Sequence, residues 1–448
     1  MSVGPDIARI GVRRWPVAVL AAAMAVACGA PPSAPIQGQL PPRPNVIVFL
    51  VDTLRADAVG FGGYDRETSP RLDRWAERGV VFDQATTPAG WTKPAVMSLF
   101  TGLYAGTHGA EDKEHVAAGE LVTLAEVFGA AGYETAAFIT NFAVSEKFGC
   151  VQGFERYRWF DKKVDASPDA SKMLNYVQIR DIDDEVRAYL EEPRERPIFA
   201  YIHTTDPHIP YLPPLDFLVF GTEARDRYDA EVLMTDTFLG GWFDLLEEAG
   251  LLESSIVVLT ADHGEEFYEH GRNGHGVTIF QEIARIPLVV WAPGLTPGRR
   301  DEQVSLTDLA PTLVEAAQVA APPGFASQGR SFWEVITGAS RGADWSWSYL
   351  DLVFRTKAIA FAYREGSEKI LHIDGDVDGR RDFTALYDVA ADPFEQVNLA
   401  KKRPDRAKLL SEKMMELRQM HRAASVSPID EPLTGEALDQ MRSLGYVD

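Results

Sequence analysis

Cysteine is nearly absent from this chain, which has two cysteines in 448 residues. Cys28 follows a segment that we expect to be removed, and Cys150 lies far downstream. If processing consumes Cys28, Cys150 is the only thiol and no intramolecular disulfide can form. We therefore expect a large core that is stable without covalent cross-links, as in a large exported protein.

Positive charge is also scarce, because 44 Lys and Arg stand against 66 Asp and Glu and give a formal net charge of -22. A negative surface repels a phosphate backbone, so the composition argues against a nucleic-acid partner. Long apolar runs are missing after Cys28 as well. A run of about 18 or more residues is needed for a membrane helix, which argues against a membrane-embedded architecture.

The N-terminal residues have the pattern of an export signal. Arginines precede the apolar run WPVAVLAAAMAVA at residues 15–27, which is short for a membrane span and predicts a signal peptide over residues 1–27. Residues 25–28 resemble a bacterial lipoprotein cleavage box, in which the cysteine is lipidated; a plain signal peptide is the alternative. The proline-rich residues 28–44 predict an extended tether. We thus expect a periplasmic or cell-envelope lipoprotein that contacts the membrane only through a lipid on Cys28.

Apolar runs alternate with amphipathic segments from residue 45 to about 320, as in an α/β fold with a mostly parallel central sheet flanked by helices. The runs are apolar on both faces, like buried parallel strands, and predict strands at 45–52, 135–140, 197–204, 255–262 and 287–293. Helical spacing predicts helices at 69–79, 121–132, 228–250 and after Asp308, with Thr123 as an N-cap and Gly79, Gly132 and Gly250 as stops.

The pattern changes after about residue 345. Three short runs predict a small antiparallel sheet and are followed by an expected helix: 357–365, 368–374, 384–390 and 408–420. We therefore predict a catalytic domain over residues 45–345 and a C-terminal subdomain over residues 346–448.

Polar side chains follow the predicted strands, and ligands of open α/β sheets bind at the carboxyl ends of strands. Asp52 ends the first strand, and Asp262 and His263 end the fourth. Two carboxylates, an imidazole and a hydroxyl oxygen suit one divalent cation, namely Ca²⁺, Mg²⁺, Mn²⁺ or Zn²⁺, and a second metal stays open. The alternative is that both aspartates only cap the turns that follow.

The segment AGWTKPAVMSLFTG, residues 89–102, supplies the hydroxyl oxygen. Pro94 favours the first turn of a helix, and Gly102 follows its predicted end. Thr92 could be the N-cap of this helix. Alternatively, a cation at its oxygen would lower the pKa of the hydroxyl, and the positive end of the helix would favour an anion, which makes Thr92 a candidate nucleophile.

Histidines in two loops are candidates for binding the substrate's anionic group or for protonating its leaving group. His208 lies in DPHIPY after the third predicted strand, and His275 lies in NGHG between glycines. Further candidates for substrate contacts lie at strand ends or near Thr92: Lys93, His108, Asn141, His203 and Asp206.

Several of these motifs together resemble the sulfatase family of the alkaline phosphatase superfamily. They are NVIVFLVDTLRADAVGFGGYDRETSP, WTKPAVMSLFTGLYAGTHG, DPHIPY, VVLTADHGEEFYEHG, GHGVTIFQEIARIPLVV, LYDVAADPFEQVNLA and the terminal SLGYVD. The resemblance covers nearly all of residues 45–448. It implies an α/β core with a smaller C-terminal sheet, and a metal-dependent hydrolase of sulfate or phosphate esters.

By this resemblance, four residues fall on metal-ligand positions, with Thr92 also on the nucleophile position: Asp52, Thr92, Asp262 and His263. His208 and His275 fall on positions that contact the anionic group. The sequence departs from the family where sulfatases have a Cys or Ser followed by x-Pro-x-Arg. Here Thr92 takes the first place and Val96 the last, so no formylglycine is expected, and a threonine nucleophile resembles the phosphodiesterase and phosphotransferase branches.

The sequence thus predicts an envelope hydrolase that uses Thr92 to cleave a small-molecule, glycan or lipid ester of phosphate or sulfate. Three alternatives stay open. The protein could be a sulfatase that acts without formylglycine. It could be a transferase that moves a phospho-headgroup onto an envelope glycan, or a non-catalytic binding protein that retains the fold.

Overall fold

The computed structural model describes residues 39–161, 177–339, 347–353, 359–377, 380–444 and 446. The predicted signal peptide, most of the predicted tether and the boundary predicted after residue 345 lie outside these ranges. Within them, no helix is both long enough and apolar enough to cross a membrane.

The core is an eight-stranded sheet in the order β11-β2-β10-β7-β1-β6-β4-β5. Its strands are β1 (Asn45–Val51), β2 (Val80–Thr86), β4 (Glu134–Ile139), β5 (Arg156–Trp159), β6 (Ile198–Thr204), β7 (Ser255–Thr260), β10 (Leu288–Trp291) and β11 (Gly298–Ser305). β1 lies between β6 and β7 and is parallel to both. All five runs predicted as strands of the core form strands of this sheet. β2, β5 and β11 were not predicted; β5 and β11 are edge strands that expose charged side chains.

The direction of β10 differs from the sequence-based expectation. Residues 287–293 were expected to form a parallel strand, but β10 is antiparallel to both of its neighbours, β7 and β2. After β7 the chain stays at the same end of the sheet, where Gly264 N donates to Ile283 O at 2.9 Å. A parallel strand would have required a crossover to the opposite end. An apolar run reports burial on both faces but does not report strand direction.

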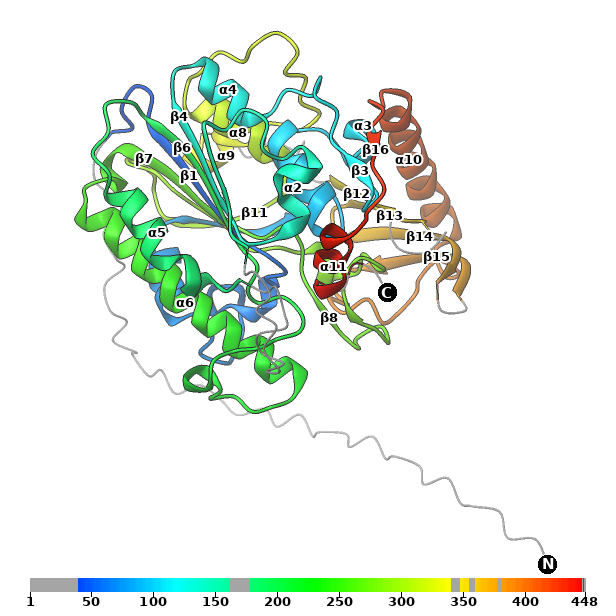
Figure 1. Ribbon diagram of the computed structural model, residues 1–448. Helices are drawn as coiled ribbons and strands as arrows, with labels where there is room; N and C mark the ends of the chain where they lie inside the picture. The colour runs from blue at the N-terminus through cyan, green and yellow to red at the C-terminus, as the bar shows by residue number, and fades with distance from the viewer. Residues whose placement is uncertain are drawn as a thin grey trace, which may run out of the picture. The chain divides into compact units, whose positions relative to one another are not determined.

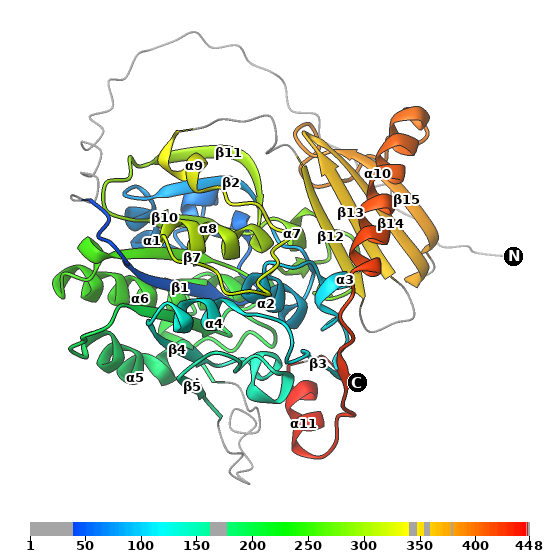
Figure 2. The same cartoon turned by 90° about the horizontal axis from the view of Figure 1, so that it is seen from above.

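Helices cover both faces of the sheet (Figures 1 and 2). One layer contains α1 (Pro70–Ala76), α5 (Ile179–Glu191) and α6 (Ala224–Glu248), and the other contains α2 (Thr92–Thr101), α4 (Leu124–Ala130) and α8 (Leu309–Ala316). The predicted N-cap of α4 is confirmed, because the Thr123 side chain accepts from Glu126 N and Glu126 reciprocates. Gly102 ends α2 with a φ of 68°, a conformation that glycine adopts without strain.

A four-stranded antiparallel sheet follows, in the order β12-β13-β14-β15. Its strands are β12 (Trp347–Val353), β13 (Ile359–Glu365), β14 (Glu368–Val377) and β15 (Arg380–Asp388). The helix α10 (Pro404–Ala423) packs on this sheet through Leu410 and Met414. The predicted α/β core with a small antiparallel C-terminal sheet is confirmed, while β12 was not predicted.

The remaining α-helices and strands are short. They are α3 (Ala105–His108), β3 (His115–Val116), β8 (Glu266–Phe267), β9 (Asn273–Gly274), α7 (Gln281–Ala284), α9 (Trp333–Thr337), β16 (Ile429–Asp430) and α11 (Glu436–Ser443). Beyond α11, Leu444 and Tyr446 belong to the same buried cluster as β1 and β7. The last described residues of the chain therefore return to the α/β core.

Candidate active site

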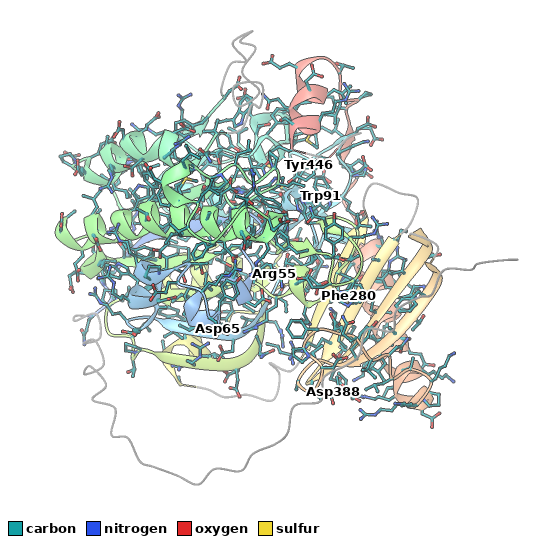
Figure 3. All side chains as sticks on the ribbon, turned by 90° about the horizontal axis from the view of Figure 1, so that it is seen from below. Arg55, Asp65, Trp91, Phe280, Asp388 and Tyr446 are labelled. Carbon is teal, nitrogen blue, oxygen red and sulfur yellow. The ribbon has the colours of Figure 1, made fainter. Side chains whose placement is uncertain are left out.

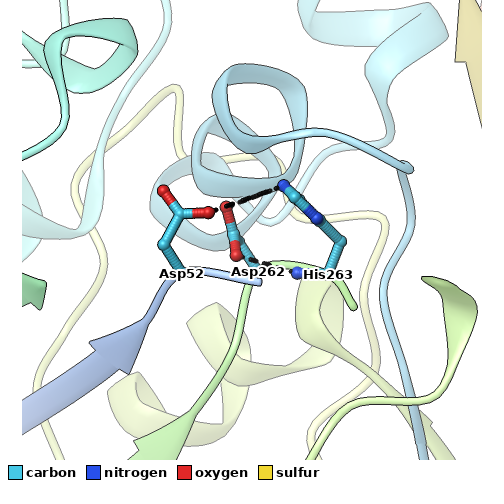
Figure 4. A group of neighbouring side chains, drawn as sticks. All are labelled: Asp52, Asp262 and His263. Atoms are coloured by element: carbon cyan, nitrogen blue, oxygen red, sulfur yellow. Dashed lines mark hydrogen bonds and ion pairs between the residues drawn. The ribbon is translucent and has the colours of Figure 1, made fainter. Parts of the chain in front are cut away.

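Asp52, Asp262 and His263 meet where β1 and β7 end (Figure 4). The two strands pair in parallel with Leu50 opposite Thr260, so the residues two places further on also lie side by side. All three side chains are fully buried. One ligand-type atom from each lies within 4.8 Å of those of the other two. This is the geometry that a shared cation requires.

The charges of this cluster also fit a divalent cation. Asp262 Oδ1 accepts from Thr53 N at 3.2 Å and from His263 N at 2.9 Å. Asp262 Oδ2 is buried and makes no hydrogen bond among the described residues, although His263 Nε2 lies 3.3 Å away. Burial, with the nearby charge of Asp52, raises the pKa of Asp262 to about 6, and burial also raises the pKa of Asp52. A bound cation would relieve this cost by neutralising two adjacent buried carboxylates.

Gly264 explains how His263 is aimed. A Cβ at this position would lie 1.9 Å from the backbone oxygen of Glu282, so no larger residue fits. The close approach fixes the turn after Asp262. His263 Nδ1 lies 2.9 Å from Gly264 O, and because a carbonyl only accepts, Nδ1 carries the proton. In the neutral ring Nε2 then presents its lone pair to the cluster, as a metal ligand does.

Thr92 is the first residue of α2, and its hydroxyl points into the cluster. Its Oγ1 lies 2.7 Å from Tyr446 OH, 3.2 Å from His263 Nε2 and 3.5 Å from Asp52 Oδ1. The N-cap position belongs to Trp91, and no side chain caps the helix. The alternative that Thr92 is only an N-cap is therefore wrong, since its hydroxyl contacts the candidate metal ligands instead of the free amides of α2.

Asn141 and His203, both predicted to contact substrate, lie behind Asp52. Asn141 Nδ2 donates to Asp52 Oδ2, and His203 Nε2 lies 3.4 Å from the same oxygen. The remaining polar atom of each side chain also has a partner. Asn141 Oδ1 accepts from Ala143 N at 2.8 Å, and His203 Nδ1 lies 3.1 Å from Tyr201 OH. Burial lowers the pKa of His203 to about 4. Both residues hold the Asp52 carboxylate in place.

His208 and His275 lie next to each other, with ring centroids 4.8 Å apart, and the His275 ring lies 4.4 Å from that of His263. His208 Nδ1 is 2.6 Å from Ile209 O, and burial lowers the pKa of His208 to about 4. His275 Nδ1 is 2.9 Å from Glu265 Oε1. The structure thus brings both predicted anion-contacting histidines to the cluster, in neighbouring positions.

Three of the residues predicted to contact the substrate lie outside the cluster. Lys93 Nζ donates to two backbone carbonyl groups, and burial lowers its pKa to about 7. His108 Nε2 lies 3.2 Å from Pro94 O and is fully buried behind α2. Asp206 Oδ2 accepts from Ile179 N at 2.6 Å and so holds the start of α5. Their side chains have structural contacts outside the cluster.

Two members of the site were missed by sequence reasoning. Glu265 adjoins the DHG segment and orients His275, as described above. Tyr446 contacts Thr92 from a position 354 residues further along the chain. The only sequence signal for Tyr446 is the terminal SLGYVD segment, which supports the family resemblance but does not indicate that this tyrosine reaches Thr92.

Comparisons with known proteins show which family this chain resembles. The family model described as Sulfatase matches residues 44–319, and the model described as N-sulphoglucosamine sulphohydrolase, C-terminal, matches residues 269–423. The ulvan-active sulfatase of Formosa agariphila is 26% identical over 402 residues, which cover 80% of this chain and 77% of the relative.

Two solved structures share the fold. One, solved in complex with its substrate D-glucosamine-2-N,6-O-disulfate, has a TM-score of 0.72 at 19% identity and covers 85% of this chain and 98% of its own. The phosphonate monoester hydrolase of Agrobacterium radiobacter has a TM-score of 0.69 at 18% identity, and the match covers 87% of this chain and 100% of the hydrolase. Because the Sulfatase model matches more than half of this chain, the chain belongs to the sulfatase family of ester hydrolases.

Proposed function

We propose that this protein is a divalent-metal-dependent hydrolase that cleaves an anionic ester with Thr92 as nucleophile, and that it prefers phosphate to sulfate esters. The observation that carries the proposal is that Thr92 Oγ1 lies 3.5 Å from Asp52 Oδ1 and 3.2 Å from His263 Nε2, two of the candidate metal ligands. Fold alone does not choose between sulfur and phosphorus, since the fold neighbours include a phosphonate monoester hydrolase. The side chain of Thr92 favours phosphate esters. The Cβ of threonine bears a methyl group, so its oxidation cannot give the formylglycine aldehyde that sulfatases use.

Asp52, Asp262 and His263 would hold the cation, which would lower the pKa of the Thr92 hydroxyl and stabilise negative charge on the transferring group. Thr92 Oγ1 loses its proton, for which Asp52 Oδ1 at 3.5 Å is an acceptor in reach. It then forms a bond to phosphorus while the bond from phosphorus to the leaving oxygen breaks. The electron pair leaves with that oxygen, which takes a proton from His275. Glu265 orients the His275 ring by its contact with Nδ1.

The second half-reaction reverses these roles. Water attacks the phosphorus of the phosphothreonine, and His275 takes one proton from it. The bond from phosphorus to Thr92 Oγ1 breaks, and Oγ1 takes back the proton that Asp52 accepted, as the phosphate product leaves. Sulfate release from a threonine ester has no aldehyde hydrate to expel it, which is the reason for proposing phosphate.

The test compares initial rates of the metal-reconstituted protein on p-nitrophenyl sulfate, phosphate monoester and phosphate diester. We expect a phosphate ester to react fastest, Thr92→Ala to be inactive, and acid quenching to trap phosphate on Thr92. Thr92→Ser keeps a hydroxyl and should retain part of the activity. Turnover by Thr92→Ala would exclude the covalent mechanism.

A second candidate function is a sulfatase that uses threonine directly. It is favoured by the family and by the sulfatase relative that acts on ulvan. A large kinetic preference for the sulfate ester in the same experiment would establish it and would overturn the preference for phosphate. The relative and the bound disulfated glucosamine of the fold neighbour also support a glycan ester as the substrate class.

We further propose that the protein is exported and anchored through a lipid on Cys28. The apolar run that ends at this cysteine supports the proposal. Metabolic labelling with a fatty acid should label the wild-type protein and not Cys28→Ala. Equal labelling of the two would contradict lipidation at this residue.

A further inference from the structure

Tyr446 closes the candidate site from the last described turn of the chain. After α11, Tyr446 N donates to Met441 O at 2.8 Å and turns the side chain inward. Tyr446 is 1% exposed, and its neighbours Leu444 and Met441 are buried as well. Figure 3 shows Tyr446 beside Trp91, which precedes the nucleophile. The tail is thus held by apolar packing, independently of any contact that the phenol makes.

The ring of Tyr446 lies among three aromatic rings of the site. Its centroid is 5.6 Å from that of Trp91, 5.9 Å from His208 and 5.8 Å from His275. A buried tyrosine places its hydroxyl against a hydrogen-bonding partner. Here the hydroxyl lies 2.7 Å from Thr92 Oγ1 and 3.5 Å from His208 Nε2.

Among the described residues, three side chains contact Thr92 Oγ1. Asp52 and His263 belong to the candidate metal cluster, whereas the ring of Tyr446 also lies 5.9 Å from that of His208, a histidine predicted to contact the substrate's anionic group. Any group bonded to Oγ1 carries its own oxygens within reach of a phenol that already lies 2.7 Å from Oγ1. Negative charge accumulates on these oxygens during transfer, so a fixed donor at this point acts on the transition state.

We propose that Tyr446 is a catalytic residue, whose phenol O–H donates to a non-bridging oxygen of the group that is transferred to Thr92. The inference rests on the proposed function, because it takes Thr92 as the nucleophile. When the ester binds, the phenol hydrogen bond passes from Thr92 Oγ1 to the ester oxygen, and no covalent bond of Tyr446 changes. The catalytic centre is therefore completed by the C-terminal tail.

Tyr446→Phe keeps the ring and removes the donor. The matched control is Tyr104→Phe, since Tyr104 is buried against Tyr349, with ring centroids 5.6 Å apart, in the separate cluster formed with the C-terminal sheet. In the metal-loaded full chain we expect Tyr446→Phe to lower kcat on the order of 100-fold, with KM changed much less. Tyr104→Phe should leave both constants unchanged, and the Tm of Tyr446→Phe should match that of the control.

Binding of orthovanadate, measured by calorimetry, separates this inference from the proposed function. If the wild type hydrolyses none of the esters, the proposed function fails. Weaker vanadate binding by Tyr446→Phe than by the wild type would still support Tyr446 as a donor. Equal binding by the two, or no binding by the wild type, overturns the inference. A higher rate for Tyr446→Phe than for the wild type also overturns the inference, because the Tyr446 hydroxyl would then hinder the reaction.

Discussion

Asp262→Asn should make the metal-free protein more stable and remove its response to a divalent cation. Burial raises the pKa of Asp262 from 3.8 to about 6, and each pKa unit corresponds to about 1.4 kcal/mol. Keeping Asp262 ionised in the folded protein therefore costs about 3 kcal/mol. Folding raises the pKa of Asp262. The stability that protonation of Asp262 contributes is therefore fully present below pH 3.8 and is lost as the pH rises through about 6. Asparagine avoids the cost, and its Oδ1 can still accept from Thr53 N and His263 N.

The assay is urea unfolding of the wild type and the variant, first with a chelator and then with a saturating divalent cation. With chelator at about pH 8, Asp262→Asn should be about 3 kcal/mol more stable than the wild type, and the difference should shrink as the pH is lowered. With cation the order should reverse, because a ligand at about 1,000 times its Kd stabilises the wild type by about 4.1 kcal/mol, which exceeds the difference of about 3 kcal/mol, and the variant lacks a ligand.

Asp308→Asn is the matched control. Burial also raises the pKa of Asp308 to about 6, and its carboxylate accepts from Ser305 N at 2.8 Å and from Arg330 N at 2.7 Å. It lies outside the candidate metal cluster, so Asp308→Asn should lose the same pH dependence and keep the full response to cation. Its amide nitrogen would face one of the two backbone N–H donors, so the comparison uses the pH slope and not the absolute stability. Equal stabilisation of Asp262→Asn and wild type by cation would refute the proposed ligand set. A less stable Asp262→Asn in chelator would refute the charge argument.

Three further predictions concern groups around the site. Burial lowers the pKa of Lys93 from 10.5 to about 7. The free energy of unfolding should therefore rise with pH between these values, by up to about 1.4 kcal/mol per pH unit, and this gain is lost as the pH falls through 7. Lys93→Met should lack this slope in urea unfolding, and parallel profiles would contradict the shift. Thr123→Ala should lose about 1 kcal/mol of unfolding free energy with its cap, and an unchanged value would show that the cap is dispensable. Glu265→Gln should lower kcat with metal content unchanged, because it weakens the contact that orients His275; an unchanged kcat would show that this contact is dispensable.

Elements with a local cause could be predicted from the sequence. The capping box at Thr123 depends on residues three positions apart, and continuous apolar runs mark buried strands such as β1 and β7. Since β1 and β7 turned out to be parallel neighbours, residues at their ends, such as Asp52 and Asp262, had to meet. Edge strands such as β11 could not be found in this way, because exposed charges break the apolar pattern.

The sequence by itself determined the alternating α/β pattern, the family motifs and the candidate oxygen and nitrogen ligands at strand ends. Tertiary structure alone decided which way neighbouring side chains point. Lys93 follows Thr92 directly, yet successive helical residues project about 100° apart, so Lys93 turns to backbone carbonyls while Thr92 enters the site. Tertiary structure also brought Tyr446 to Thr92 across 354 residues. Such a contact depends on the packing of the whole chain, and no local periodicity or spacing encodes it.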